Sequence, residues 1–337
     1  KRAAENFDLK QQNKELETKL FHSFELIGSS NNITKINDQI KKLSLTESRV
    51  FINGPTGSGK ELIARKIHKQ SNRKQKPFII LNGALLDVKK YELELFGEER
   101  SDGSISYGAL EKATGGILLI DEVSEIPLET QSKILRVLID QKFKRINGSN
   151  DIKVNVRIIC SSCKNIREEI SKGNFREDLY HRLNVFEINI EPLQNRSDDI
   201  PLLIDYFSEK ISQSYGIKKL KIDSNNPYLT EYMWPGNVRE LRNLVERIAI
   251  LSSNNNVDNT NSIIKESLKT SVEDKFNFDE KNFSVPLKEA RENFEKTYLV
   301  SQLKKFNGNI SKTADFIGME RSALHRKLKS LHIKGLN

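Results

Sequence analysis

The sequence predicts an α/β protein in which a parallel β-sheet carries helices on both faces and helical parts follow. Three observations predict this class. Short apolar runs alternate with helical segments up to about residue 190, a glycine-rich loop joins a strand to a helix, and the pattern after Pro201 is helical. Such alternation is typical of parallel sheets whose crossover helices cover both faces.

Composition narrows the class of protein. The chain has 337 residues, with 36% hydrophobic and 30% charged residues, enough for two or three domains. No apolar run approaches the roughly 20 residues of a membrane span, and no secretory signal precedes the first polar segment. Cys160 and Cys163 are the only cysteines, which excludes a disulfide framework. We therefore expect a cytoplasmic protein without a membrane partner.

The first segment, residues 1–24, is polar and helix-prone. Leu9 and Leu16 lie one heptad apart, a spacing that allows a short coiled-coil arm. A single exposed helix fits the same residues. We expect this segment to be a linker helix.

The next part, residues 25–195, is predicted to be the α/β part. Its expected strands are Arg49–Asn53, Phe78–Leu81, Gly116–Asp121 and Val154–Cys160. The third is a continuous apolar run, as in a strand buried on both faces. Residues 196–252 are predicted to form a helical lid of the same domain, 25–252.

The last two segments differ in composition. Residues 253–283 are rich in Asn, Asp, Ser and Lys, which predicts a flexible linker. Residues 284–337 contain eleven Lys and Arg against five Asp and Glu, so they hold six of the nine net positive charges. A basic excess in so short a domain points to nucleic acid as partner. The alternative is a solvated basic surface.

The strongest local signal is GPTGSGK, Gly54–Lys60, between a predicted strand and a predicted helix. In G-x-x-x-x-G-K loops, backbone N–H groups surround phosphates and the lysine reaches the terminal ones. The next residue is Glu61, so the usual magnesium-binding hydroxyl is absent. The alternative is a structural glycine turn. Expected nucleotide-binding residues are Gly54, Pro55, Thr56, Gly57, Ser58, Gly59, Lys60 and Glu61.

Three further segments carry candidate chemistry. GGILLIDE ends in Asp121, which would hold Mg²⁺ through water, and Glu122, which would polarise the attacking water. FREDLYHRLNV contains Arg176 and Arg182, placed to reach a neighbouring subunit's nucleotide or to form ordinary surface salt bridges. WPGNVRELRNL predicts a turn that caps a helix with Arg239 in its first turns.

These four segments, in this order, resemble the AAA+ domain of bacterial enhancer-binding proteins, the activators that work with sigma-54. The resemblance runs from about Leu26 to Leu251 and includes IGSS and ELFG. It implies a hexameric or heptameric ring that hydrolyses ATP between subunits, while the sequence leaves open whether the assembly is a hexamer, a heptamer or only a dimer. It also implies roles for six residues: phosphate binding by Lys60, Walker B acids at Asp121 and Glu122, arginine fingers at Arg176 and Arg182, and a sensor at Arg239.

The C-terminal segment Gly308–Leu331 predicts two helices with a turn at Gly318–Met319. Thr313, Ala314, Phe316 and Ile317 supply an apolar face for the first helix, and Leu324 and Leu328 supply one for the second. A helix-turn-helix presents the free face of its second helix to the major groove. Expected DNA contacts are Lys312, Arg321, Ser322, His325, Arg326, Lys327 and Lys329.

This segment resembles the Fis-type DNA-binding domain. Its amino-acid sequence is especially similar to that of the NtrX group of response regulators. The resemblance implies DNA and RNA polymerase as partners, and an NtrY-like sensor histidine kinase acting through a receiver domain. No phosphoacceptor pattern precedes the AAA+ part, so we expect the receiver to be absent from this chain.

Two segments depart from the enhancer-binding pattern. After Gly97 the chain reads EERSDGSISYG, which is shorter than the usual loop and lacks its GAFTGA motif. This argues against a sigma-54 contact there, and NtrX proteins commonly lack the motif. Cys163 stands where relatives carry an asparagine that positions the Walker B glutamate. A thiol cannot make that amide pair, so we expect slow ATP hydrolysis.

The leading interpretation is an NtrX-like regulator in which ATP binding, gated by phosphorylation of a receiver, controls oligomerisation and DNA occupancy. The regulator would then act on promoters as a repressor or an activator, according to the position at which it binds. The alternative is an ATP-driven sigma-54 activator with a divergent loop. A third interpretation is a redox-responsive DNA-binding module that rests on Cys160 and Cys163, whose C-x-x-C spacing also fits two ordinary thiols.

Overall fold

The computed structural model describes residues 25–85, 88–220, 222–223, 226–251, 257–273, 291–292, 295–296, 298–300, 302–303, 306 and 309–331. The linker helix expected at residues 1–24 lies outside them. The chain divides into two compact units, residues 1–268 and 269–337, which are described separately.

The first unit is built on a five-stranded parallel sheet in the order β2-β5-β8-β1-β9. Val50 at the start of β1 pairs with Ile159 of β8 on one side and with Phe186 of β9 on the other. The strands are β1 (Val50–Asn53), β2 (Phe78–Asn82), β5 (Ile117–Asp121), β8 (Arg157–Ser162) and β9 (Phe186–Asn189). The predicted parallel α/β sheet is therefore confirmed.

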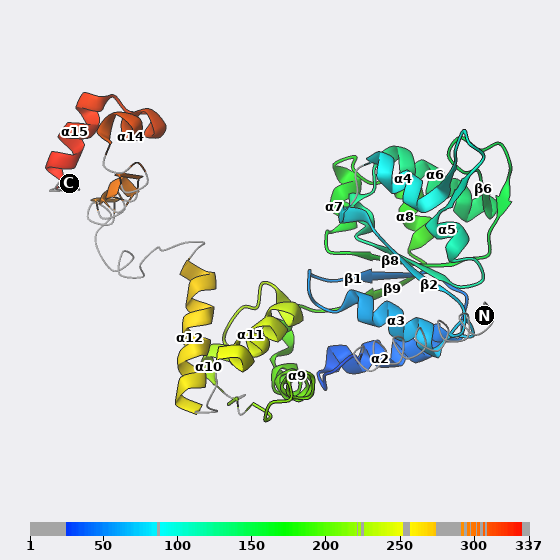
Figure 1. Ribbon diagram of the computed structural model, residues 1–337, viewed down its shortest axis with the longest axis horizontal. Helices are drawn as coiled ribbons and strands as arrows, with labels where there is room; N and C mark the ends of the chain where they lie inside the picture. Colours follow the sequence, from blue (N-terminus) through cyan, green and yellow to red (C-terminus); the bar gives the residue numbers. More distant parts are fainter. Residues whose placement is uncertain are drawn as a thin grey trace. The chain divides into compact units, whose positions relative to one another are not determined.

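Helices cover both faces of this sheet (Figure 1). Alternate strand residues point to opposite faces, so Val50 and Ile52 of β1 pack with α2 and α3 while Phe51 packs against the other layer. One layer is α2 (Asn31–Ser44) and α3 (Lys60–Gln70). The other contains α4 (Val88–Phe96), α5 (Ala109–Lys112), α6 (Leu128–Asp140), α7 (Ile166–Ser171) and α8 (Glu177–Leu183).

Two antiparallel hairpins project from the second layer. Strands β3 (Gly97–Glu99) and β4 (Ile105–Tyr107) form one, and β6 (Lys142–Phe143) and β7 (Ile152–Lys153) form the other. Arg145 joins them, since its guanidinium contacts Glu99 at 2.8 Å and Glu111 at 2.6 Å and lies over the Tyr107 ring. The β3–β4 segment is therefore an anchored hairpin.

The lid follows the sheet and is helical, as predicted. Its elements are the 3₁₀ helix η3 (Leu193–Asp199), α9 (Ile200–Tyr215), α10 (Pro227–Thr230), α11 (Asn237–Leu251) and α12 (Val257–Glu273). Trp234, 1% exposed, lies in their core and donates from its indole to the Leu229 carbonyl at 2.9 Å.

Helix α12 differs from the flexible linker expected at 253–283. Ile264 and Leu268 are buried in the lid core, with Ile263 packed against it. Their spacing of four residues places both on one helix face, and Asn226 also donates to Asn261 at 2.9 Å. Packing of these few apolar residues therefore outweighs the polar composition of the segment.

The second unit contains α14 (Ile310–Ile317) and α15 (Arg321–Ser330). Ala314, Leu324 and Leu328 pack with Leu299 and Leu303. Gly318 adopts φ +70° after α14, and the Met319 N–H donates back to the Ala314 carbonyl at 3.0 Å. The turn predicted at 318–319 is confirmed, but Phe316, expected on the apolar face, is 54% exposed, and its ring lies tilted against that of Phe306.

None of the helices within the described residues is long and apolar enough to cross a membrane.

Candidate functional site

The glycine-rich loop connects β1 to α3, as the motif predicts. Gly54 is fixed to the sheet by its N–H, which donates to the Ser162 carbonyl at 3.2 Å. The Ser58 hydroxyl is buried without a hydrogen-bond partner among the described residues. Across the residues that the structure describes, no protein group accepts a hydrogen bond from the backbone N–H of Gly57 or Gly59. These donors remain available for an anion at the start of α3.

Lys60 is 6% exposed and lies inside the curve of this loop. Its ammonium donates to the carbonyls of Gly54 at 2.9 Å and Pro55 at 3.4 Å. It also forms an ion pair of 3.0 Å with Glu122. The lysine is thereby held at the centre of the site, while Glu61 turns along α3 to pair with Arg65 at 2.7 Å.

Asp121 ends β5 beside this lysine. The Ser161 hydroxyl donates to one of its carboxylate oxygens, and the Asn82 amide donates to the other at 3.3 Å. Both partners come from the neighbouring strands β8 and β2, because the carboxyl ends of parallel strands meet at one edge. Asn82 was not predicted from the sequence; its position at the end of a predicted strand was the available signal.

Glu122 has the left-handed backbone conformation, with φ +54°. Burial acts to raise the pKa of its carboxyl group, but hydrogen bonds from Cys163 and the charge of Lys60 outweigh this and keep that pKa below its usual value. The backbone N–H of Cys163 donates to Glu122 at 2.8 Å. Cys163 therefore does contact the glutamate, although not through an amide side chain.

The lid contacts the phosphate loop directly. Gly57 has φ +76°, and a Cβ there would lie 2.2 Å from the Gly236 carbonyl. The Asn237 amide donates to the Thr56 carbonyl at 3.0 Å and accepts from the Leu193 N–H at 2.8 Å. The backbone N–H of Arg239 donates to the Gly57 carbonyl at 3.3 Å. The turn at Gly236 and the first residues of α11 thus couple the lid to the loop.

A buried arginine makes a second connection that sequence reasoning missed. Arg196 donates to the carbonyls of Ser58 at 3.0 Å and Glu191 at 3.1 Å, and it faces Asp199 at 3.6 Å. Asp199 in turn accepts from the backbone N–H groups of Ser29 and Ser30. An Arg-x-x-Asp pair in a polar stretch gave no reason to expect burial.

One cavity of about 900 Å³ brings these groups together. It contains Thr56–Glu61, both acids Asp121 and Glu122, and the lid residues Arg239 and Arg242. Apolar and aromatic side chains from two segments also line it, namely Ile27, Leu203, Tyr206 and Phe207. A lining that combines polar and apolar groups suits a nucleotide with its phosphates and base.

The two candidate finger arginines lie elsewhere, Arg176 directly before α8 and Arg182 in its last turn. Arg176 forms a bidentate contact with Asp178, at 2.6 and 3.0 Å, and touches the Ser132 hydroxyl at 3.3 Å. Arg182 lines a second cavity. Neither reaches the nucleotide cavity of its own chain, which is compatible with their predicted action on a neighbour.

Helix α15 presents the side chains predicted to contact DNA. Arg321, Ser322, His325, Arg326 and Lys329 are exposed, as is Lys312 at the start of α14. Lys327 is half-buried and pairs with Glu295 at 2.7 Å. These assignments remain predictions, and the Glu295 contact sets Lys327 apart from the rest.

The cysteine pair is divided between core and surface. Cys160 is buried in β8, and burial raises the pKa of its thiol. Cys163 is exposed, with its thiol pKa raised by partial burial and by Glu122. Within the described ranges, no group of three or more His, Cys, Asp or Glu could hold a metal ion.

Comparison with known proteins gives the family. Residues 26–189 match the sigma-54 interaction domain, residues 194–276 match the AAA+ ATPase lid domain, and residues 290–331 match the Fis family of bacterial regulatory proteins. The nitrogen assimilation regulatory protein NtrX of Azorhizobium caulinodans is 44% identical over 98% of this chain and 74% of its own length. The chain belongs to the NtrX family.

Solved NtrX structures agree with this family and with the fold. NtrX from Brucella abortus in complex with ADP has a TM-score of 0.73 and 44% identity over 98% of this chain and 74% of that one. The same protein in complex with ATP has a TM-score of 0.72, again with 44% identity, over 96% of this chain and 73% of that one. The resemblance drawn from the motifs is thereby confirmed.

Proposed function

We propose that this chain is a transcription regulator that binds ATP between its AAA+ sheet and lid and uses the nucleotide to control self-association and DNA occupancy. The observation that carries the proposal is the cavity that joins the phosphate loop, Asp121, Glu122 and Arg239. A ligand there contacts both the sheet and the lid. Its presence can therefore set how the lid is held.

Three features support ATP as the ligand. The unpartnered Ser58 hydroxyl and the N–H groups of Gly57 and Gly59 suit phosphate oxygens. Lys60 is already oriented by two carbonyls, so it needs only to exchange Glu122 for a phosphate. Brucella abortus NtrX was solved with ATP and with ADP.

The residues present fit a magnesium ion. Mg²⁺ is usually bound through one or two carboxylates together with substrate phosphates and water. Asp121, with its carboxylate oriented by Ser161 and Asn82, would hold it in this way. When bound, the ion would neutralise charge on the phosphates. We propose that Glu122 polarises the attacking water, and that hydrolysis is slow because Cys163 rather than an asparagine is its neighbour.

The remaining assignments follow from this core. Fis-type helix α15 is proposed to contact DNA, with RNA polymerase as the downstream partner. Self-association, from a dimer to a ring, is proposed to place Arg182 of one copy at the nucleotide of another. An NtrY-like kinase acting through a receiver domain, and a cytoplasmic location, are proposed from the family.

Replacing Lys60 tests nucleotide binding. We expect Lys60→Ala to weaken ATP affinity at least about tenfold, since charge-assisted hydrogen bonds to phosphate are lost. Isothermal titration of full-length wild-type, Lys60→Ala and Lys60→Arg protein with Mg·ATP measures this, and unfolding curves check that each variant folds. Equal affinity in all three would exclude this cavity as the ATP site.

One observation favours the alternative of a sigma-54 activator with a divergent loop. The β3–β4 hairpin exposes Ile105 and Tyr107, at 45% and 56%, where an interaction partner could reach them. ATP-dependent open-complex formation at a sigma-54 promoter, with an established activator as positive control, separates the two functions. We expect closed complexes only; open complexes would establish the alternative.

A further inference from the structure

A second cavity of about 560 Å³ lies at the opposite end of the sheet from the phosphate loop. Arg49 precedes β1, Arg157 begins β8, and Arg182 and Val185 precede β9, so the amino ends of three strands meet here. The end of α6, Val137–Ile139 and Gln141, forms another wall. Of the residues that line this cavity, Arg182 alone carries a proposed role.

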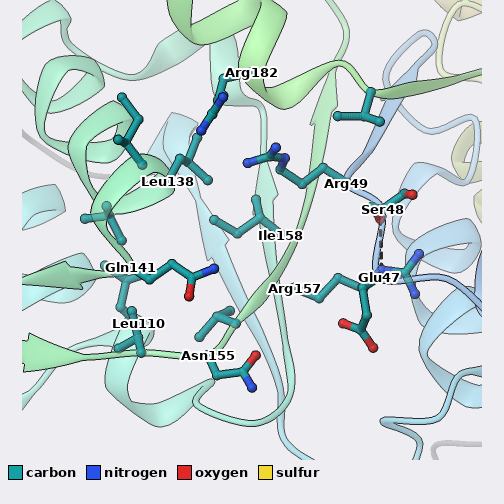
Figure 2. A pocket seen from close by; sticks show the side chains of 15 residues that line it. Glu47, Ser48, Arg49, Leu110, Leu138, Gln141, Asn155, Arg157, Ile158 and Arg182 are labelled. Atoms are coloured by element: carbon teal, nitrogen blue, oxygen red, sulfur yellow. Dashed lines mark hydrogen bonds between the residues drawn. The ribbon is translucent and has the colours of Figure 1, made fainter.

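Two arginines converge in it without a counterion. Figure 2 shows the guanidinium groups of Arg49 and Arg182 pointing toward one another. In the described part of the chain, no hydrogen bond or ion pair joins either group to the protein. Glu47 is the carboxylate in the cavity wall, but it pairs with Arg73 at 2.8 Å. Burial and the charge of Arg182 both lower the pKa of Arg49, as expected for a cation that lacks an anion.

Hydrogen bonds to the preceding segment fix the position of the Arg49 backbone. Arg157, 3% exposed, donates to the carbonyls of Ser48 at 3.0 Å and Leu43 at 2.9 Å. These bonds hold the segment that leads from α2 into β1, directly before Arg49. Arg49 is therefore presented to the cavity by a fixed backbone, which reduces the entropy lost when it binds a ligand.

The rim of the cavity suits a protein-borne ligand. Ile139 and Val185 both line it and are 56% and 54% exposed. A free phosphate ion would gain nothing from these apolar side chains, whereas a protein surface that carries an anion would bury them. Two neighbouring arginine forks match the oxygens of a phosphate chain.

We propose that Arg49 acts together with Arg182 and that the pair binds the terminal phosphates of a nucleotide held by the phosphate loop of a second copy of this chain. This inference rests on the proposed ATP binding and self-association, and its new element is Arg49. Arg176 lies outside this cavity and would first have to leave Asp178. Arg49 and Arg182 need to break no contact.

The test is ATP-dependent assembly of the full chain, followed by sedimentation velocity over a range of protein concentrations. We expect Arg49→Ala and Arg182→Ala each to raise the concentration for half-assembly in Mg·ATP by roughly ten- to a hundredfold. Arg49→Lys should fall between Arg49→Ala and wild type, because it keeps the charge without the fork. Arg176→Ala should have a smaller effect than Arg49→Ala. Arg167→Ala, which removes an exposed arginine from α7, should assemble like wild type.

Two measurements show whether the arginine acts on another copy. ATP affinity at protein concentrations below assembly should be the same for Arg49→Ala and wild type. A mixture of Arg49→Ala and Lys60→Ala should form ATP-dependent complexes that neither variant forms alone, since one supplies the nucleotide and the other supplies Arg49.

The contrary outcomes are distinct. Wild-type-like assembly of Arg49→Ala, or a loss of ATP affinity by its isolated subunit, overturns this inference alone. If dilute Lys60→Ala still bound ATP and lost that binding when Arg49→Ala was added, the second cavity would bind free nucleotide instead. A wild-type chain that binds ATP but does not assemble overturns the proposed self-association, and this inference with it.

Discussion

At the scale of single residues, the candidate site depends on close backbone approach. Gly57 lies where the phosphate loop meets the lid, and its N–H is among the donors available to phosphate. The left-handed conformation costs an alanine about 1 kcal/mol. The Gly236 carbonyl adds a clash, because a Cβ at position 57 would lie 2.2 Å from it.

We therefore expect Gly57→Ala to lower both the free energy of unfolding and the ATP affinity. Gly103→Ala is the matched control, because Gly103 has φ +82° but a Cβ added there would meet nothing within 4 Å. The control should lose about 1 kcal/mol and bind ATP normally. Urea unfolding and isothermal titration measure the two effects, and equal losses in both variants would show that contact with the lid does not constrain the loop.

The pKa of Glu122 predicts a pH dependence. Because the folded protein keeps this pKa below its usual value, the contribution of Glu122 to stability is present above the unfolded pKa of about 4.3 and is lost as the pH falls through the folded value. The difference in free energy of unfolding between wild type and Glu122→Gln should then shrink as the pH falls below about 5. Urea unfolding without nucleotide at a series of pH values measures it; a difference that grows toward acid would contradict the assignment.

Much of the site could be predicted at this scale, because the glycine-rich loop and the two acids lie at the ends of strands in the sequence. Lys60, Asp121, Glu122 and Arg239 line one cavity, as the order of the motifs suggests. Asn82, Arg196 and Asn237 could not be found in the same way. Their roles come from contacts between residues far apart in the chain, such as the 3.0 Å bond from Arg196 to Ser58.

At the scale of elements, side-chain packing determines the structure of segments whose composition alone is ambiguous. The sheet follows from apolar runs that alternate with helices, and each predicted strand is present with ends close to those expected. The segment of helix α12 was expected as linker because residues 253–283 are rich in Asn, Asp, Ser and Lys. Ile264 and Leu268 nevertheless reach the lid core, and contacts of that kind are invisible in a window of local composition.

We predict three kinds of DNA contact for the side chains of helix α15. We expect Arg321→Ala to relax sequence specificity, since an exposed arginine at the start of a recognition helix can read base edges. Lys329→Ala should weaken all sequences alike and reduce the salt slope by about one. Lys327→Ala should change the slope less, because Glu295 already holds that ammonium at 2.7 Å.

Fluorescence anisotropy with a selected duplex and a scrambled duplex, at several salt concentrations, measures these effects. Equal weakening of both duplexes by Arg321→Ala would remove it from base recognition. If Lys327→Ala reduced the salt slope as much as Lys329→Ala does, Lys327 would have to leave Glu295 and contact DNA.

At the scale of the whole molecule, self-association is proposed to link the nucleotide cavity to DNA occupancy. The lid contacts the phosphate loop through Asn237 and Arg239, and the second cavity offers Arg49 and Arg182 to an anion. In the proposed account, a bound nucleotide would contact the lid of its own chain through the first cavity and the arginine pair of another copy. A dimer or ring would bind DNA through several α15 helices at once, which would raise its effective affinity without any new base contact.

The most direct test of this link is DNA affinity measured with and without Mg·ATP, using a duplex selected from a random library by the wild-type protein. We expect ATP to tighten binding by the wild-type protein and to leave Lys60→Ala at the affinity of the nucleotide-free state. DNA affinity that is independent of ATP in the wild type, at concentrations where ATP is bound, would contradict nucleotide control of DNA occupancy.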